Sequence, residues 1–211
     1  MTLTITLNNL GKKYNKEWIF RGLTHEVAPN QKLLILGGNG SGKSTLLQVI
    51  SGFVTPNEGE VLFSAGDKKL EPDSLKNHIA FASPYLQLIE DFTLREMAEH
   101  SQLFKPFVKN TSVKELIDIL QLVPARDKPI KQFSSGMKQR LKLGLAILSD
   151  TPVLLLDEPV SNLDKNAIAW YKEMITAYAQ NRTVIVCSNA IADEHFFCDR
   201  ELNVMDYKFS K

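Results

Sequence analysis

A glycine-rich octapeptide near the start of the chain constrains the fold more than any other feature. Residues 37–44 read Gly-Gly-Asn-Gly-Ser-Gly-Lys-Ser, which fits the phosphate-loop pattern G-x-x-x-x-G-K-[ST]. The apolar residues 32–36 before it predict a buried strand, and residues 45–51 after it predict a helix that stops at Gly52. The alternative, a glycine-rich turn with an incidental lysine, does not account for this strand and helix.

The residue types in this loop suit the phosphates of a nucleotide. Glycine adopts backbone angles that other residues resist, and it lets the chain approach an anion closely. A helix beginning near Gly42 would point unpaired N–H groups and its positive dipole end at the phosphates. Lys43 is expected to contact the β- and γ-phosphates, and the Ser44 hydroxyl to bind Mg²⁺. The predicted nucleotide contacts are Gly37, Gly38, Asn39, Gly40, Ser41, Gly42, Lys43, Ser44 and Thr45.

Composition narrows the class of protein. With 211 residues and 44% hydrophobic content, residues 1–211 can form one domain with a substantial core. The net charge of +1 and the lack of a basic block argue against nucleic acid as a partner. No apolar run approaches the length of about 18 residues that spans a bilayer, and the first residues alternate like a strand rather than a signal peptide. We therefore expect a cytosolic protein, in which Cys187 and Cys198 form either a disulfide or, as a reducing cytosol favours, free thiols.

Hydrophobic patterning predicts an α/β core with a helical insertion at roughly residues 85–150. Strands are expected at residues 3–7, 23–27, 32–36, 59–63, 78–82, 153–156, 183–187 and 201–205. Helices are expected at residues 94–103, 113–122, 135–148, 165–179 and 192–197. Thr93 and Ser112 are each followed three residues later by a glutamate, which predicts a capping box at the start of two of these helices.

A second acidic motif follows the strand at residues 153–156. Four apolar residues lead directly into Asp157 and Glu158. A strand buried on both faces delivers such carboxylates at its carboxyl end, where α/β sheets bind ligands. We expect Asp157 to hold Mg²⁺ and Glu158 to polarise the attacking water. An ordinary strand followed by an acidic turn would have the same sequence pattern, but the upstream phosphate loop favours a metal-binding and catalytic site here.

Three further segments resemble motifs of the ABC-type ATPases. Residues 133–140, Phe-Ser-Ser-Gly-Met-Lys-Gln-Arg, resemble the LSGGQ signature and the helix that follows it. Residues 161–164, Ser-Asn-Leu-Asp, resemble the D-loop of that family, and Tyr14 lies where the family keeps an aromatic residue that stacks on adenine. The resemblance covers nearly the whole chain in the family's order of motifs, and Phe133, Ser135 and Met137 are mild departures from the signature.

The resemblance implies both a fold and a mechanism. The fold is a P-loop NTPase core with a mixed sheet, an N-terminal antiparallel β subdomain and a helical subdomain. Two such domains sandwich two ATP molecules head to tail, so that Ser134, Ser135 and Gly136 of one chain meet the γ-phosphate held by the other. Asp164 would communicate between the two sites. Read without the resemblance, Ser134 is a plain helix N-cap.

Tyr14 has a second reading too, because Trp18 and Phe20 lie close to it in the sequence. Any of these three aromatic side chains could pack in the core or against the sheet edge instead of stacking on the base.

Two positions depart from the family pattern, and both concern catalysis. The family has a glutamine near Pro84, and proline offers neither a polar side chain nor an N–H group. Tyr85 or Gln87 could substitute for it, although a shifted alignment would give the same appearance. The family also has a histidine where this chain has Asn189, which can donate a hydrogen bond to the γ-phosphate but cannot carry a positive charge. We expect slow ATP hydrolysis, or reliance on a partner's complete site.

The predicted role is the ATP-binding subunit of an ABC transporter on the cytoplasmic face of a membrane. Its expected partners are a second nucleotide-binding domain, in a homodimer or heterodimer, and a separate transmembrane permease subunit. The permease would dock near residues 85–92, unless the apolar side chains there pack the helical lobe onto the core. The alternative is a soluble ATP-gated clamp that acts on cytosolic protein or ribosomes with little hydrolysis. A metabolic kinase is a more distant alternative, because no acceptor pocket is recognisable.

Overall fold

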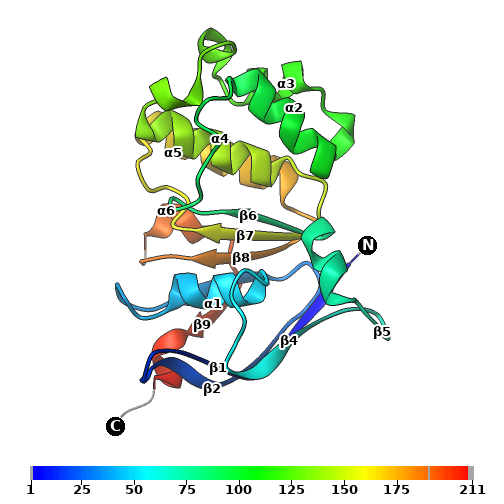
Figure 1. Ribbon diagram of the computed structural model, residues 1–211, viewed down its shortest axis with the longest axis vertical. Helices are drawn as coiled ribbons and strands as arrows, with labels where there is room; N and C mark the ends of the chain where they lie inside the picture. The colour runs from blue at the N-terminus through cyan, green and yellow to red at the C-terminus, as the bar shows by residue number, and fades with distance from the viewer. Residues whose placement is uncertain (1, 190, 209–211) are drawn as a thin grey trace.

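Two separate β-sheets organise the chain in the computed structural model, which describes residues 2–189 and 191–208 (Figure 1). The antiparallel sheet has the order β2-β1-β4-β5, with β1 Thr4–Tyr14, β2 Glu17–Val27, β4 Glu58–Ala65 and β5 Lys68–Lys69. The second sheet has the order β6-β7-β8-β3-β9, with β6 Ile79–Ala82, β7 Val153–Asp157, β8 Thr183–Cys187, β3 Lys32–Leu36 and β9 Arg200–Asn203. All neighbouring strands of this second sheet pair in parallel.

The helices lie where local sequence signals predict them. They are α1 Lys43–Ile50, α2 Leu94–Phe104, α3 Val113–Ile119, α4 Ser135–Ile147, α5 Lys165–Tyr178 and α6 Ala192–His195. Both predicted capping boxes are confirmed. The Thr93 hydroxyl accepts from the Glu96 N–H at 3.2 Å, and the Glu96 carboxylate accepts from the Thr93 N–H at 2.7 Å. This contact with the Thr93 backbone lowers the pKa of Glu96.

The parallel sheet separates two hydrophobic cores. Successive residues of a strand point to opposite faces, so Leu154 and Leu156 of β7 pack with α2, α3, α4 and α5. Leu155 of β7 and Ile185 of β8 pack on the other face with α1 and the antiparallel sheet. Figure 1 shows the resulting layers: the helices α2–α5, then the parallel sheet, then α1, then the antiparallel sheet. Both β7 and β8 are buried along their whole length.

The predicted fold class is confirmed, with one correction to the sheet. The core sheet was expected to be mixed, whereas its described strands are all parallel. The antiparallel strands pair only with one another; short turns join β1 to β2 and β4 to β5, whereas β3 and α1 lie between β2 and β4 in the chain.

The first two strands are also much longer than predicted. Pairing between β1 and β2 slips between Leu7 and Leu10 and again up to Lys13. These irregularities place polar residues where alternation would require apolar ones. Gly59 allows β4 to approach β1 closely, because a Cβ atom at this position would lie 2.2 Å from the Asn8 carbonyl oxygen.

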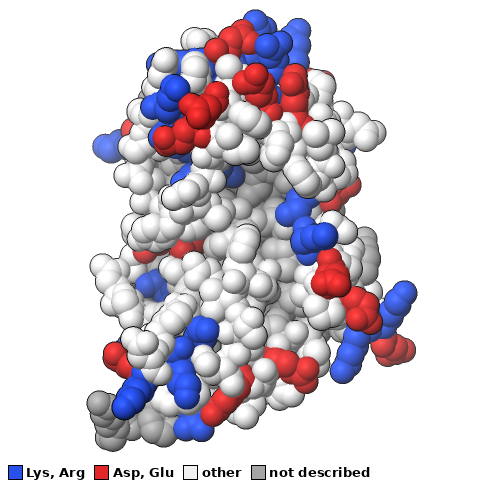
Figure 2. All heavy atoms as spheres, in the orientation of Figure 1, with Lys and Arg blue, Asp and Glu red and all other residues white. Residues whose placement is uncertain are grey.

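The surface carries charges of both signs. On the face that Figure 2 shows, charges gather at the helical end, at the antiparallel end and along the right flank, around a hollowed and mostly uncharged centre. Both cysteines are free thiols, with Cys187 buried in β8 and Cys198 partly buried. Among residues 2–189 and 191–208, no helix combines the length and the apolar character needed to cross a bilayer.

Candidate functional site

The predicted phosphate loop borders a cavity of about 470 Å³ at the carboxyl ends of the parallel strands. In Figure 1 the arrowheads of β7 and β8 point to the side of the molecule where the loop before α1 lies. The described residues that line the cavity are Ile19, Asn39, Gly40, Ser41, Gly42, Lys43, Ser44, Thr45, Tyr85, Glu158 and Asn189. Two distant parts of the sequence, the loop and the acidic motif, therefore meet at one cavity.

The loop has the backbone geometry that an anion site requires. Gly42 precedes α1 with φ 106°, a conformation that favours glycine, and a Cβ there would lie 2.3 Å from the Ile19 side chain. No side chain caps the first turn of α1. The N–H groups of this turn and the positive end of the helix dipole are therefore available to a phosphate.

Lys43 is held inside the loop by three oxygen atoms. Its side-chain Nζ donates to the carbonyls of Gly37 at 2.8 Å and Gly38 at 3.1 Å. It also donates to Oδ1 of Asn189 at 2.7 Å. The residue is only 5% exposed. An entering triphosphate would take over this buried ammonium group from neutral acceptors, which bind it less strongly than an anion does.

Asp157 lies at the floor of the site between two serines. Its carboxylate accepts from Ser44 Oγ at 3.0 Å and from Ser83 Oγ at 3.2 Å. Burial raises the pKa of Asp157, and the hydrogen bonds from Ser44 and Ser83 act against this rise. The donor set fits Mg²⁺, which prefers oxygen ligands and takes one or two from protein while phosphates and water supply the rest. Ser44 and Asp157 would hold the ion.

Glu158 and Asn189 both line the cavity and are hydrogen-bonded to each other. Glu158 has φ 44°, outside the usual range for a residue with a side chain, and its N–H donates to the Cys187 carbonyl at 3.0 Å. Asn189 Nδ2 donates to Glu158 Oε1 at 2.8 Å, while Asn189 Oδ1 accepts from Lys43. The asparagine amide thus bridges the loop lysine and the predicted catalytic glutamate.

The signature residues form a second cluster away from the loop. Ser134, Ser135, Gly136 and Asp164 line a cavity of about 390 Å³ that contains none of the phosphate-loop residues. Ser134 is the N-cap of α4 and accepts from the Met137 N–H at 3.2 Å. Asp164 caps α5, accepting from the Ala167 N–H at 2.8 Å. The N-cap reading of Ser134 is therefore correct, and the residue remains exposed at the end of its helix.

Tyr14 ends β1 on the surface. Its side chain is 47% exposed, whereas the nearby Phe20 is completely buried. The Lys12 ammonium group lies 5.1 Å from the centre of the Tyr14 ring. Tyr14 does not line the phosphate-loop cavity. Core packing is thus excluded for Tyr14, and stacking on a base stays a prediction.

The segment at residues 83–92 divides between two roles. Tyr85 borders the phosphate-loop cavity, whereas Gln87 lines a neighbouring one. Tyr85 is therefore the better placed of the two substitutes that we considered for the missing glutamine. Leu88 and Phe92 pack against the helical core, while Ile89 is 41% exposed. The predicted packing onto the core is thus confirmed for Leu88 and Phe92, and docking of a permease at this segment stays a prediction.

Sequence reasoning missed two residues of the site. Ser83 directly follows the strand predicted at residues 78–82, and its hydroxyl donates to Asp157. It follows Ala82, which pairs with Leu156, so it lies beside the next residue of β7. The available signal was a polar residue directly after a buried strand, the same signal that identified Asp157. Ile19 of β2 covers Gly42 at the start of α1, a contact for which the sequence offers no local signal.

The fold and this site define a P-loop nucleotide-binding protein: a parallel sheet, a glycine-rich loop before α1, and a paired carboxylate at the end of a neighbouring strand. Residues 20–161 match the family described as ABC transporter. The chain belongs to this family, and the predicted family membership is confirmed.

Relatives in the family include exporters and importers. Nod factor export ATP-binding protein I of Rhizobium meliloti (strain 1021) is 27% identical over 204 residues, covering 94% of this chain and 61% of that protein. The sulfate/thiosulfate import ATP-binding protein CysA of Bradyrhizobium diazoefficiens is 33% identical over 169 residues, covering 77% of this chain and 49% of that protein. The chain therefore spans about half to two thirds of the length of these relatives.

Solved structures agree with the fold. A putative ABC transporter ATP-binding protein from Pyrococcus furiosus has a TM-score of 0.78 at 22% identity, covering 98% of this chain and all of that one. A dimeric ATP-binding cassette with bound ADP and Pi has a TM-score of 0.79 at 23% identity, covering 94% of this chain and 93% of that one.

Proposed function

We propose that this chain is the ATP-binding subunit of an ABC transporter, which binds and hydrolyses ATP between two such subunits and drives a separate membrane subunit. The observation that carries the proposal is the division of the site into two clusters. The phosphate loop lies at one cavity and the signature residues Ser134–Gly136 lie at another. A nucleotide enclosed by both clusters requires a second copy or a similar domain.

Each residue then has a chemical task in the complete site. The loop N–H groups and Lys43 bind the phosphates, and Ser134, as the exposed N-cap of α4, places a hydroxyl and a helix N-terminus at the γ-phosphate of the other subunit. Ser44 and Asp157 hold Mg²⁺. When bound, Mg²⁺ supplies positive charge that stabilises the phosphate oxygens during transfer.

Glu158 acts as the general base for the attacking water. Its carboxylate lies at the phosphate-loop cavity, with its orientation set by the bond from Asn189. A positioned carboxylate accepts the proton of the water as the oxygen attacks the γ-phosphorus. Asn189 is a positioning residue in this scheme, because it orients Glu158 and neutralises none of the phosphate charge.

Assembly can be tested by light scattering with the slowly hydrolysed analogue ATPγS and Mg²⁺. The apparent mass is expected to rise from the 23.8 kDa of one chain toward twice that value. Ser134→Asp keeps an N-cap acceptor but faces the γ-phosphate with a negative charge, so dimerisation should weaken at least about tenfold. Ser134→Asn, a neutral cap, is the matched control. A chain that stays monomeric under all conditions, or dimerises equally well as Ser134→Asp, would contradict the proposal.

Exchanging Asn189 for histidine tests the expectation of slow turnover. An imidazole can donate to the γ-phosphate and can also carry a positive charge, so we expect Asn189→His to hydrolyse ATP about tenfold faster. Steady-state phosphate release from purified protein measures this. Asn189→Ala, which lacks any donor, should be slower than the wild type. A wild type that is already fast and gains nothing from histidine would refute the idea.

We propose that the permease places this subunit on the cytoplasmic face of a membrane. If a multi-span protein co-purified with this chain from detergent-solubilised membranes, that result would support this role. Co-sedimentation with ribosomes and no membrane protein supports the soluble clamp instead, a reading that Pro84 and Asn189 favour because they weaken the catalytic positions.

A further inference from the structure

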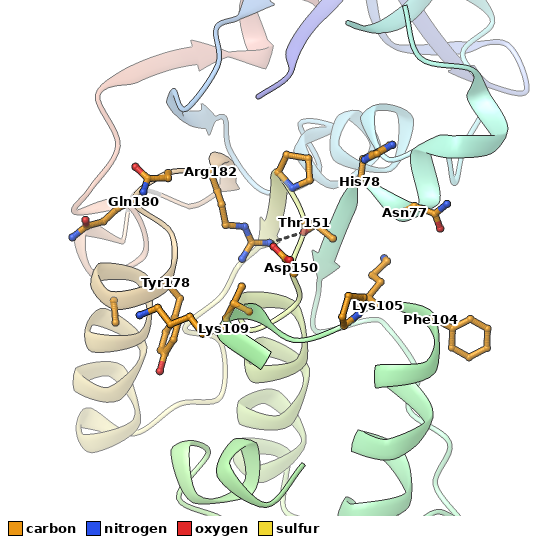
Figure 3. Close-up of a pocket in the computed structure, with 15 residues that line it drawn as sticks. Asn77, His78, Phe104, Lys105, Lys109, Asp150, Thr151, Tyr178, Gln180 and Arg182 are labelled. Carbon is orange, nitrogen blue, oxygen red and sulfur yellow. Dashed lines mark hydrogen bonds between the residues drawn. The ribbon is translucent and has the colours of Figure 1, made fainter. Parts of the chain in front are cut away.

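A second cavity lies at the amino ends of the parallel strands, whereas the phosphate loop lies at their carboxyl ends. It has a volume of about 900 Å³, larger than the phosphate-loop cavity. His78, Thr151 and Arg182, which line it, come just before β6, β7 and β8, so the cavity opens where these strands begin. The end of α2 and the end of α5 form its other walls (Figure 3). No residue of the proposed nucleotide site lines it.

The charged lining of this cavity is predominantly basic. Lys105, Lys109 and Arg182 line it together with a single acidic residue, Asp150. In Figure 3, Arg182 and Asp150 lie in the middle of the cavity, with Lys109 and Lys105 on opposite sides of them. Among the described residues, neither Lys105 nor Lys109 forms an ion pair with a carboxylate. The cavity thus holds more positive charge than its own residues neutralise.

Arg182 is the fixed centre of this group. It is only 6% exposed, and its guanidinium donates to the Ile147 carbonyl at 2.6 Å and to Thr151 Oγ1 at 2.7 Å. These acceptors are neutral, and the charge of Asp150 opposes only part of the effect that burial has on the pKa of Arg182. Its Nε–H is buried and has no partner. Such orphaned donors are rare, because a buried donor without a hydrogen bond destabilises the folded protein.

The environment of Lys105 also favours the binding of an anion in this cavity. Lys105 Nζ donates to the Ile79 carbonyl at 2.6 Å, which leaves its other two hydrogens for a ligand. Burial lowers the pKa of Lys105, and the charge of Arg182 lowers it further. Burial also lowers the pKa of Arg182 to about 10. An anion between these groups would relieve both effects.

The size and the apolar walls restrict the ligand. A cavity of this volume is in the range that holds small molecules rather than polypeptide domains. Val108, Pro152 and the ring of Tyr178 supply apolar lining, and the Lys109 ammonium lies 5.4 Å from the centre of that ring. We propose that this cavity binds a small organic anion, whose carboxylate or phosphate group contacts Arg182 and the two lysines while an apolar ring packs beside Tyr178 and Val108. This inference is independent of the nucleotide site.

The Arg182 Nε–H offers a direct readout by NMR. Benzoate and phenyl phosphate serve as probes of the two anion types, and benzyl alcohol is the neutral analogue of the same size. We expect either anion to shift the Arg182 Nε–H signal in a saturable way, and benzyl alcohol to bind at least about tenfold more weakly. Phenyl phosphate could also enter the phosphate loop, but only binding at this cavity moves the Arg182 signal.

Variants of the two lining lysines separate this site from general attraction to lysines. Lys109→Gln and Lys105→Gln leave the buried guanidinium and its partners intact, and each should weaken anion binding about tenfold. Lys128→Gln removes an exposed lysine that does not line the cavity and should change nothing. Tighter binding of either benzoate or phenyl phosphate supports the proposal, and the tighter probe shows whether the ligand carries a carboxylate or a phosphate group. An unmoved Arg182 signal with both anions, equal binding of benzyl alcohol, or equal loss in Lys128→Gln would overturn it.

Discussion

Replacing Glu158 by glutamine is expected to lower ATP hydrolysis by at least about 100-fold while ATP binding persists. The amide cannot accept a proton from the attacking water. The substitution preserves the site otherwise, because the glutamine Oε1 can still accept from Asn189 Nδ2, as Glu158 does at 2.8 Å. Phosphate release under single-turnover conditions measures the chemical step, and calorimetry with Mg-ATP measures the affinity.

The matched control for this experiment is Glu173→Gln, which removes an exposed carboxylate of α5 that does not line the phosphate-loop cavity. It should leave both quantities unchanged. If Glu158→Gln turned over ATP at nearly the wild-type rate, Glu158 would not be the base.

The second large effect is expected from Lys43→Met, which should weaken Mg-ATP binding about 100-fold. Methionine has a similar length but carries no charge, so the triphosphate loses its buried ammonium partner. The carbonyls of Gly37 and Gly38 and the amide of Asn189 also lose their donor. We expect the free energy of unfolding to fall by about 1–3 kcal/mol for this reason.

Calorimetry and thermal unfolding, measured on the same preparation, separate the two consequences of Lys43→Met. Lys16→Met, at an exposed position between β1 and β2, is the control and should show neither effect. Unchanged affinity for Mg-ATP in a folded Lys43→Met protein would remove the main support for a nucleotide site at this loop.

Much of the site was predictable because its signals are local in the sequence. The phosphate loop requires a strand before it and a helix after it, and both lie beside it in the chain. Asp157 and Glu158 were predictable from a general rule, since a buried parallel strand delivers its last residues to the ligand edge. The bond between Ser44 and Asp157 confirms that these two motifs meet.

Contacts between strands that are distant in sequence were not predictable. The position of Ser83 after a buried strand was a usable signal for the site, but its contact with Asp157 was not predictable, because it depends on the pairing of β6 with β7. The bridge from Lys43 through Asn189 to Glu158 depends on the positions of three separate strand ends. The extension of β1 was missed for a related reason, because its bulges break the alternation that marks a strand.

The parallel sheet that serves as a common wall for both cores has a consequence for folding. Leu154 and Leu155 are adjacent in β7, yet each contributes to a different core. Removing either half of the molecule would expose one whole face of this strand to water. We therefore propose that residues 1–211 unfold in one cooperative step, and that neither the helical part nor the antiparallel part would persist as an isolated fragment.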